Sequence, residues 1–379
     1  MNRIKPVDGL RACAVVGVIW AHIWMFFGNL PTTVSGIDIN KIISFGGIGV
    51  DLFFVISGFC MYLMYSKKAS HFSLNSYLGF FKQRWIRIAP AFYAAVVVEA
   101  VIYFIINSQF PIKSVLAHFF FVNTLFPGNV LSPPFWSLAT EWHFYLLLPF
   151  LFIKLQKPSD IVWRVLLLML ISQALRVQVF SSNAFLQGVT INTDMIWYRF
   201  IEFGFGIISC WFYLSGKKLP FILSGVIGFL IAGSIAWMGR LLMATEVLRY
   251  LGEQAYWGRA FGETFLTLGF AIMILNIIQT SHIFSRILAS APFTFIGKIS
   301  YSMYLWHWLI TANLSAWVVS RFGASSLTFE LTFFASIAIL IPVSWLSYKL
   351  LEEPYFKKRH SKDMPQKVQT NLSQELIVK

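Results

Sequence analysis

The sequence predicts an all-α protein, a polytopic membrane bundle of about ten transmembrane helices with one amphipathic helix at the membrane interface. Of its 379 residues, 57% are hydrophobic and only 12% are charged, about half the charged fraction of a soluble domain. The apolar runs reach about 20 residues, enough for a helix to cross a hydrocarbon layer of about 30 Å. A transmembrane β-barrel would instead show alternating strands of about 10 residues. Composition and run length therefore exclude both a soluble domain and a barrel.

The predicted spans follow one another along the chain with mostly short connections. They centre near residues 10–28, 46–65, 88–107, 141–155, 162–180, 195–214, 220–238, 260–279, 297–318 and 328–350. Basic residues gather in alternate connections, at 67–87, Lys154, Lys157, Lys217, Lys218, Arg286, Lys298 and 357–359. By the positive-inside rule these connections lie in the cytoplasm, together with both termini.

Two connections and the C-terminal end depart from this pattern. Residues 80–87 carry basic side chains among aromatic ones, as an amphipathic helix at the cytoplasmic interface does. Residues 108–140 hold an apolar piece too short to cross, followed by Gly128 and a pair of prolines, and predict a re-entrant or interfacial segment. We expect one membrane domain over residues 1–356 and a polar, disordered cytoplasmic tail over 357–379.

Charge and cysteine content limit the functional classes further. The net charge of +14 does not indicate nucleic-acid binding, because the basic residues lie in the connections between spans. Cys13, Cys60 and Cys210 all fall inside apolar runs, so they predict neither disulfides nor a metal site and are interpreted as packing residues. The first apolar run continues through residues 24–27 without a small-residue cleavage site, so we expect the first helix to be retained.

Two ionisable residues, Arg11 and His22, lie beside or within the first apolar run, residues 12–27. Their spacing places them on one helix face, about 20° apart around the axis and about 16 Å apart along it. Ionisable groups inside a membrane are costly and usually face a bundle interior or a substrate path. The alternative, a flanking arginine and a structural interior histidine, stays open at this point.

Four ionisable residues from different spans are expected at similar depth. A rise of about 1.5 Å per residue from the predicted span ends brings His22, Asp51, Glu141 and His307 to comparable levels in the bilayer. A histidine with a carboxylate partner is the usual arrangement of a general base, so we expect Asp51 or Glu141 to orient His22. A buried hydrogen-bond network without catalysis is the alternative, and it weighs most at His307.

Basic residues on the cytoplasmic side indicate a site for a phosphorylated donor. Arg84 and Arg87 are three residues apart and share a helix face, a spacing that can clamp a phosphate group, and Arg11 lies on the same side. For Lys82 we favour positive-inside topology or contact with anionic lipids, which is also the alternative for the arginines.

Other ionisable positions are better explained by structure. Arg199 and Glu202 are again three residues apart and are predicted to pair within the sixth span. Glu352 and Glu353 close the last span before a proline, and we expect them to pair with basic residues on the cytoplasmic side.

An ordered set of short motifs runs from the first span to the last. The blocks are residues 7–11 with His22, 49–59, 84–90, 135–138 with Glu141, Phe144 and Tyr145, Arg199 with 202–203, 299–302, 305–307 and 352–354. Their polar members that either bind substrate or stay structural are Trp136, Ser137, Arg199, Glu202, Ser300, Tyr301 and His307. Together these blocks resemble the acyltransferase family 3 of bacterial membrane O-acyltransferases, over nearly the whole chain.

The resemblance implies a multi-pass enzyme of the bacterial inner membrane that transfers an acyl group, most often acetyl from acetyl-CoA, to a glycan hydroxyl. It implies His22 as the catalytic histidine, Arg11 as its motif partner, Arg84 and Arg87 as donor-binding residues, and no metal. The acceptor would be a surface or secreted glycan such as O-antigen, exopolysaccharide or an oligosaccharide, lipid-linked or free. His22 would then act as a general base, in one catalytic set with Arg11 and the two carboxylates named above.

Two features depart from the family pattern. Many relatives have Glu-Gln after the position of Glu141, whereas this chain has Trp142 and His143, so the role of Glu141 stays open. We also expect a standalone form without the SGNH-type esterase domain of some relatives, and therefore not a two-domain transfer to peptidoglycan.

A transporter or flippase that uses the polar interior as a path is the alternative from another class. It would predict repeat-related broken helices, which the sequence does not show. The acceptor sugar, the acyl length, the side of transfer, a direct or acyl-enzyme route and the oligomeric state are left open by the sequence.

Overall fold

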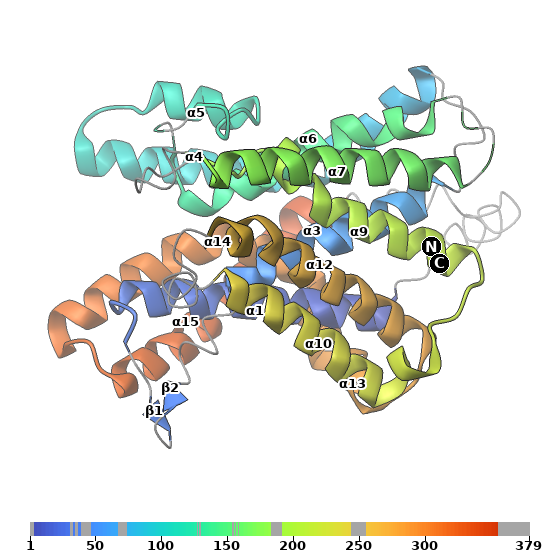
Figure 1. Ribbon diagram of the computed structural model, residues 1–379. Coiled ribbons are helices and arrows are strands. Elements are labelled where there is room, and N and C mark those ends of the chain that lie inside the picture. The colour runs from blue at the N-terminus through green and yellow to red at the C-terminus, as the bar shows by residue number, and fades with distance from the viewer. Residues whose placement is uncertain are drawn as a thin grey trace, which may run out of the picture.

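The computed structural model describes residues 4–30, 33–34, 37–38, 47–66, 74–126, 128, 130–153, 155, 157, 159–182, 192–243 and 255–354. Over these residues the chain is a helix bundle, and two strands of two residues each, β1 (Thr33–Val34) and β2 (Ile37–Asp38), pair antiparallel. Figure 1 shows the helices packed side by side. The predicted all-α membrane bundle is therefore confirmed. The predicted tail at 357–379 and the basic residues at 67–73, Lys154 and 357–359 lie outside the described residues.

Each predicted span overlaps a helix of the bundle. The longer helices are α1 (Lys5–Phe26), α3 (Gly49–Tyr65), α4 (Leu74–Asn107), α6 (Trp136–Leu147), α7 (Asp160–Phe180), α9 (Ile196–Leu214), α10 (Gly225–Leu242), α12 (Ala255–Gln279), α14 (Ala291–Phe322) and α15 (Ser326–Ser347). The shorter ones are α5 (Ile112–Phe119), α13 (Ile283–Leu288), 3₁₀ turns at Pro133–Phe135, Leu148–Phe152 and Phe221–Leu223, and a π-helical turn at Tyr348–Glu352.

Within the described residues, five helices are long and apolar enough to cross a membrane: Lys5–Phe26, Tyr77–Asn107, Gly225–Leu242, Tyr256–Gln279 and Ser326–Glu352. Helix α3 is apolar but only 17 residues long. Helix α6 has 12 residues and gives way to a 3₁₀ turn that contains Pro149, because proline removes a helical donor and clashes with the preceding turn. The full count of ten spans stays a prediction.

Helix α4 differs from the sequence prediction in how far it extends. Residues 80–87, expected as a separate interfacial helix, are part of this single helix of 34 residues, which continues through Pro90. At 1.5 Å per residue it is about 51 Å long, more than a hydrocarbon layer of about 30 Å. Helix α5, with 8 residues, is too short to cross, as expected, and folds back onto α4, where the Tyr93 hydroxyl donates to the Phe119 carbonyl at 2.9 Å.

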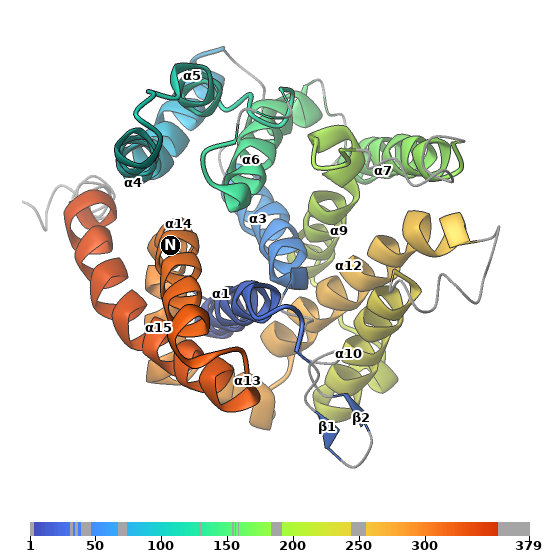
Figure 2. The ribbon, with the colours of Figure 1, turned by 90° about the vertical axis from the view of Figure 1, so that its left-hand side faces the viewer.

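Helix α1 lies in the middle of the bundle (Figure 2). It packs against α14, α3 and α15, while α3 packs against α9, and α12 against α10 and α9. A Cβ at Gly49 would clash with the Ala14 carbonyl, and one at Gly297 would clash with the Asp8 carbonyl. These glycines let α3 and α14 approach the backbone of α1 closely. The helix that carries Arg11 and His22 is thus held on two sides.

Candidate functional site

A cavity of about 530 Å³ opens between α1, α3, α4, α6, α14 and the end of α15. Its size falls within the range of small-molecule sites. Apolar side chains such as Phe53 and Leu138 form part of its wall. Its polar and charged lining residues are Asp8, Arg11, Ser57, Arg87, Ser137, Glu141, Tyr145, Lys298, Ser300, Tyr301, Tyr304, Tyr348, Glu352 and Glu353.

Three cationic side chains from three different helices line this cavity: Arg11 of α1, Arg87 of α4 and Lys298 of α14. Arg11 Nη1 lies 3.4 Å from the Asp8 carboxylate one turn earlier, and Nη2 lies 3.6 Å from Cys60 Sγ. Lys298 Nζ lies 4.9 Å from the centre of the Tyr348 ring. Sequence reasoning assigned Lys298 to topology alone, because its place beside Arg11 depends on how α14 crosses α1.

The two arginines predicted as a phosphate clamp are separated by the structure. Arg87 lines the cavity, whereas Arg84 is completely buried and donates to the sulfur atoms of Met61 and Met64, at 3.4 and 3.3 Å. Three residues along a helix leave a rotation of about 60°, which is enough to turn Arg84 into the contact between α4 and α3. Lys82 is exposed, in keeping with the topological role favoured for it.

Glu141 belongs to a hydroxyl network in the wall of the cavity. Its Oε1 accepts from Ser57 Oγ at 2.6 Å and from the Tyr145 hydroxyl at 2.5 Å. Nearby, Ser137 Oγ lies 2.7 Å from the Tyr304 hydroxyl, which donates to the Pro134 carbonyl at 2.9 Å. Ser57 and Tyr304 were not singled out by the sequence, although Ser57 lies inside one highlighted motif and Tyr304 lies between two of them.

The remaining predicted cavity residues lie on α14 and at the end of α15. Ser300 and Tyr301 line the cavity, and the Tyr301 hydroxyl donates to the Ile88 carbonyl of α4 at 3.0 Å. Glu352 accepts from Ser302 Oγ at 2.6 Å, and Glu353 pairs with Lys349 at 3.0 Å. The two glutamates therefore have partners on α14 and on their own helix.

His22 pairs with His307 across the contact of α1 with α14. Its Nδ1 lies 3.1 Å from His307 Nε2, while His307 Nδ1 lies 2.5 Å from the backbone carbonyl of Tyr304. The indole of Trp308 meets the His22 ring edge-on, with the ring centres 5.1 Å apart. The expected carboxylate partner of His22 is therefore corrected, because the side chain that contacts His22 is His307. The histidines are not among the residues that line the cavity, whereas Tyr304, which accepts from His307, is.

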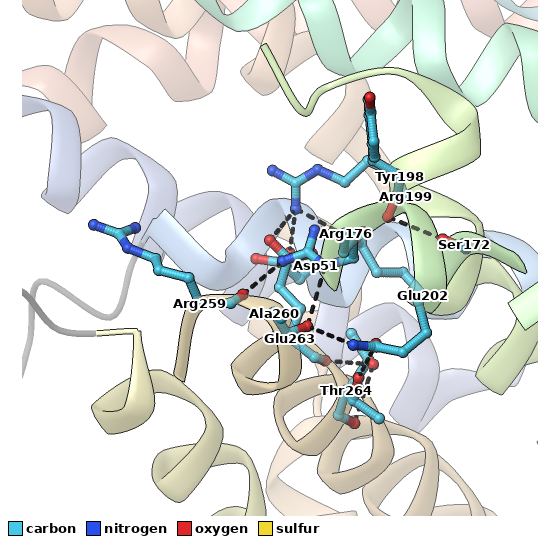
Figure 3. Close-up of polar contacts among 12 residues, drawn as sticks. Asp51, Ser172, Arg176, Tyr198, Arg199, Glu202, Arg259, Ala260, Glu263 and Thr264 are labelled. Atoms are coloured by element: carbon cyan, nitrogen blue, oxygen red, sulfur yellow. Dashed lines mark hydrogen bonds and ion pairs between the residues drawn. The ribbon is translucent and has the colours of Figure 1, made fainter. Parts of the chain in front are cut away.

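Asp51 is part of a buried charge network centred on Arg199 (Figure 3). Arg199 Nη1 lies 3.1 Å from Asp51, 2.9 Å from Glu202 and 2.9 Å from Glu263, and the guanidinium lies 5.0 Å from the centre of the Trp136 ring. The predicted pair of Arg199 with Glu202 is present, with three further carboxylates around it, those of Asp51, Glu263 and Asp194. Asp51 is turned toward α9 and α12, and this orientation explains why it does not meet His22.

The network extends to α7 and α12. Arg176 Nη1 lies 2.5 Å from Glu263, and the same guanidinium donates to the carbonyls of Arg259 and Ala260 (Figure 3). Sequence reasoning missed Arg176 and Glu263, although ionisable residues inside two predicted spans were the available signal. Oxygens of Asp51, Glu202 and Glu263 lie within 4.8 Å of one another, but Arg199 Nη1 already supplies positive charge among them.

Comparison with known proteins agrees with the motifs. Residues 4–349 match the acyltransferase domain known as acyltransferase 3. The O-acetyltransferase OatA of Staphylococcus aureus (strain NCTC 8325 / PS 47) is 26% identical over 377 residues, which cover 94% of this chain and 57% of OatA. A putative O-acetyltransferase of S. aureus (strain COL) is 25% identical over 383 residues, covering 94% and 58%.

The chain therefore spans a little over half the length of these curated relatives. No solved structure shows a significant match. The family match covers most of the chain, including every helix from α1 to α15. This protein belongs to the acyltransferase 3 family.

Proposed function

We propose that this protein is a membrane O-acyltransferase that transfers an acetyl group from acetyl-CoA to a hydroxyl of a surface or secreted glycan, with His22 as the general base. One observation carries the proposal: a cavity is lined by three cationic side chains and by Tyr304, whose backbone carbonyl accepts a hydrogen bond from His307, the partner of His22. The relatives named O-acetyltransferases support the reaction class.

The charges of the cavity suit a donor that carries several phosphates. Arg11, Arg87 and Lys298 approach from three helices, so they can surround a polyanion rather than contact one of its sides. The apolar wall, including Phe53 and Leu138, suits the uncharged arm that ends in the thioester. In this arrangement the phosphates lie at the cations and the thioester extends toward Tyr304 and the histidines.

The reaction then balances without a further reagent. The acceptor hydroxyl gives its proton to the unprotonated nitrogen of His22 while its oxygen bonds to the thioester carbonyl carbon. The carbon–sulfur bond breaks, and the leaving CoA thiolate takes the proton from the His22 imidazolium. The products are the glycan ester and free CoA. General-base catalysis of this kind is worth about 10²- to 10⁴-fold, and positioning of the two substrates adds to it.

Cysteine protection tests the donor site directly. Cys60 lines the cavity beside Arg11, so a variant with Cys13→Ser and Cys210→Ser keeps one reporter thiol in the site. CoA should slow maleimide labelling of Cys60, and dephospho-CoA should protect it less at equal concentration. Unchanged labelling of folded protein at millimolar CoA would remove the donor from this cavity.

The acceptor and the orientation need measurements in cells. Surface glycan of a deletion strain should lack an acetyl ester that the wild-type gene restores and His22→Ala does not. Reporter fusions after Lys218 and Lys357 should report the cytoplasm, and fusions within residues 239–258 the outside. A periplasmic C-terminus would overturn the proposed donor access, and unchanged glycan in the deletion strain would leave the transporter alternative.

A further inference from the structure

The protonation of His307 follows from the group that it faces. Its Nδ1 lies 2.5 Å from the Tyr304 carbonyl oxygen, and a carbonyl can only accept a hydrogen bond. Nδ1 of His307 therefore carries the hydrogen. His307 is completely buried and, over the described residues, forms no ion pair with a carboxylate, so the neutral ring is favoured. A neutral imidazole has one N–H, which leaves Nε2 of His307 as a hydrogen-bond acceptor.

This acceptor in turn determines the tautomer of His22. Nδ1 of His22 lies 3.1 Å from Nε2 of His307, and two nitrogen lone pairs facing each other at this distance would repel. Nδ1 of His22 must therefore be the donor. The hydrogen of the neutral His22 ring is then committed to His307, and its Nε2 atom presents a lone pair.

We propose that His307 is a positioning residue that holds His22 in the Nδ1–H tautomer and so presents Nε2 as the base toward the acceptor hydroxyl. The catalytic consequence rests on the proposed function, whereas the tautomer does not depend on it. A carboxylate usually orients a catalytic histidine, but here Asp51 bonds to Arg199 and Glu141 to Ser57 and Tyr145. A second histidine, fixed by a backbone carbonyl, fills the orienting role.

The neighbours of the pair support a fixed ring. Trp308 follows His307 in the chain, and its indole meets the His22 ring at 85°, which opposes rotation of that ring. Thr311, one turn after His307, donates to the His307 backbone carbonyl at 2.7 Å and does not touch either imidazole nitrogen through that bond. Thr311→Val is therefore a matched control that removes a buried hydrogen bond from the same helix.

The first test is spectroscopic and independent of acyl transfer. Nitrogen-15 NMR of histidine-labelled protein in bilayers reports the tautomer of each ring, and the His22 signals are assigned by their loss in His22→Gln. Wild type and Thr311→Val should show His22 protonated at Nδ1. His307→Gln should preserve this state, because its amide oxygen can accept at about the same place. His307→Leu should shift the population toward the Nε2–H form.

Two results would overturn the proposal. One is a wild-type His22 protonated at Nε2. The other is an unchanged tautomer in folded His307→Leu, which would assign the role to the Val18 carbonyl, a second hydrogen-bond partner of His22 one turn earlier on α1. If His307→Leu does not fold, wild type and His307→Gln still decide the tautomer assignment.

The second test measures catalysis. His307→Leu should lower kcat about 10- to 100-fold, less than the loss of the base itself, with the KM for acetyl-CoA unchanged because the cations of the cavity are intact. His307→Gln should recover most of kcat, and Thr311→Val should match wild type. Loss of kcat in both His307 variants, with a normal tautomer, would reduce His307 to a packing residue. If the wild-type protein transferred no acyl group, the proposed function would be wrong, but the tautomer measured by NMR would still hold.

Discussion

The Arg199 network and the cavity are both buried and charged, but different groups surround their cations. In the network, Arg199 and Arg176 meet carboxylate oxygens at 2.5 to 3.5 Å, and one nitrogen of Arg199 faces three carboxylates. In the cavity, Arg11 has its ion pair at 3.4 Å, and Lys298 contacts an aromatic ring. A cation surrounded by carboxylates ties helices together, whereas Arg11, beside the Asp8 carboxylate, and Lys298, beside an aromatic ring, have binding capacity for an anion.

This difference separates a structural role from a binding role without reference to residue type. The network joins α3, α7, α9 and α12 through ion pairs between their side chains (Figure 3). The cavity residues come from helices that also meet one another, but their charges face an open volume. Substitutions in the two regions should therefore affect different measurements.

The largest effect is expected at Arg199. Arg199→Met would leave Asp51, Glu202 and Glu263 facing one another without their shared cation, and breaking a buried ion pair costs about 3–5 kcal/mol. We expect little folded protein in detergent, measured by size-exclusion chromatography and thermal unfolding. Lys298→Met is the matched control, because it removes a cation from the cavity and should unfold like wild type. Normal thermal unfolding of Arg199→Met would erase the distinction between the two regions.

His22 should show the opposite pattern. His22→Ala should reduce acyl transfer by about 10²- to 10⁴-fold, the value of a general base, while its abundance in the membrane and its unfolding temperature stay near wild type. The reason is that His22 is only partly buried and, among the described residues, its ring bonds to His307 and to the Val18 carbonyl of its own helix, neither of which is charged. Full glycan acetylation by a normally abundant His22→Ala protein would remove it from the mechanism.

How far the sequence could predict these regions depends on which geometric quantity was needed. Length and hydropathy place the helices, and the rise per residue brings His22, His307 and Asp51 to similar depth. The depth of a residue in the membrane does not say in which direction around the bundle axis its side chain lies. Only the packing of α1 against α14 brings His307 to His22, and only the packing of α3 against α9 turns Asp51 to Arg199.

The same limit applies to the basic residues. Spacing alone put Arg84 and Arg87 on one face, but a rotation of about 60° between them decides between a helix contact and the cavity wall. Lys298 is far from Arg11 in the chain, so only the crossing of α14 over α1 reveals their shared cavity. Residue types in spans predicted which side chains matter, and the tertiary contacts assign their partners.

The affinity for CoA should therefore depend on Arg87 but not on Arg84. Arg87→Ala and Lys298→Ala should each weaken CoA binding about 10- to 100-fold, since a charge-assisted hydrogen bond is worth about 1.5–3 kcal/mol. Calorimetric titration of the purified variants measures this directly. Arg84→Met should bind CoA like wild type and instead unfold at lower temperature. If folded Arg84→Met bound CoA more weakly and Arg87→Ala bound it normally, Arg84 would be the donor-binding residue and the assignment from the structure would be wrong.

The smallest effect, and the one that most sharpens the comparison, is expected at Asp8. This carboxylate lines the cavity 3.4 Å from Arg11, so Asp8→Asn makes the cavity more positive while keeping the size of the side chain. Repulsion between one carboxylate and a bound phosphate, screened by water in the cavity, is small, and its removal should tighten CoA binding about 2- to 5-fold. The gain in affinity should shrink as the salt concentration is raised.

Asp51→Asn is the control in the other region, because its carboxylate faces Arg199 rather than the cavity, and it should leave CoA affinity unchanged. Weaker CoA binding by Asp8→Asn would mean that Asp8 orients Arg11 for the donor, so that even this loose ion pair is part of the site.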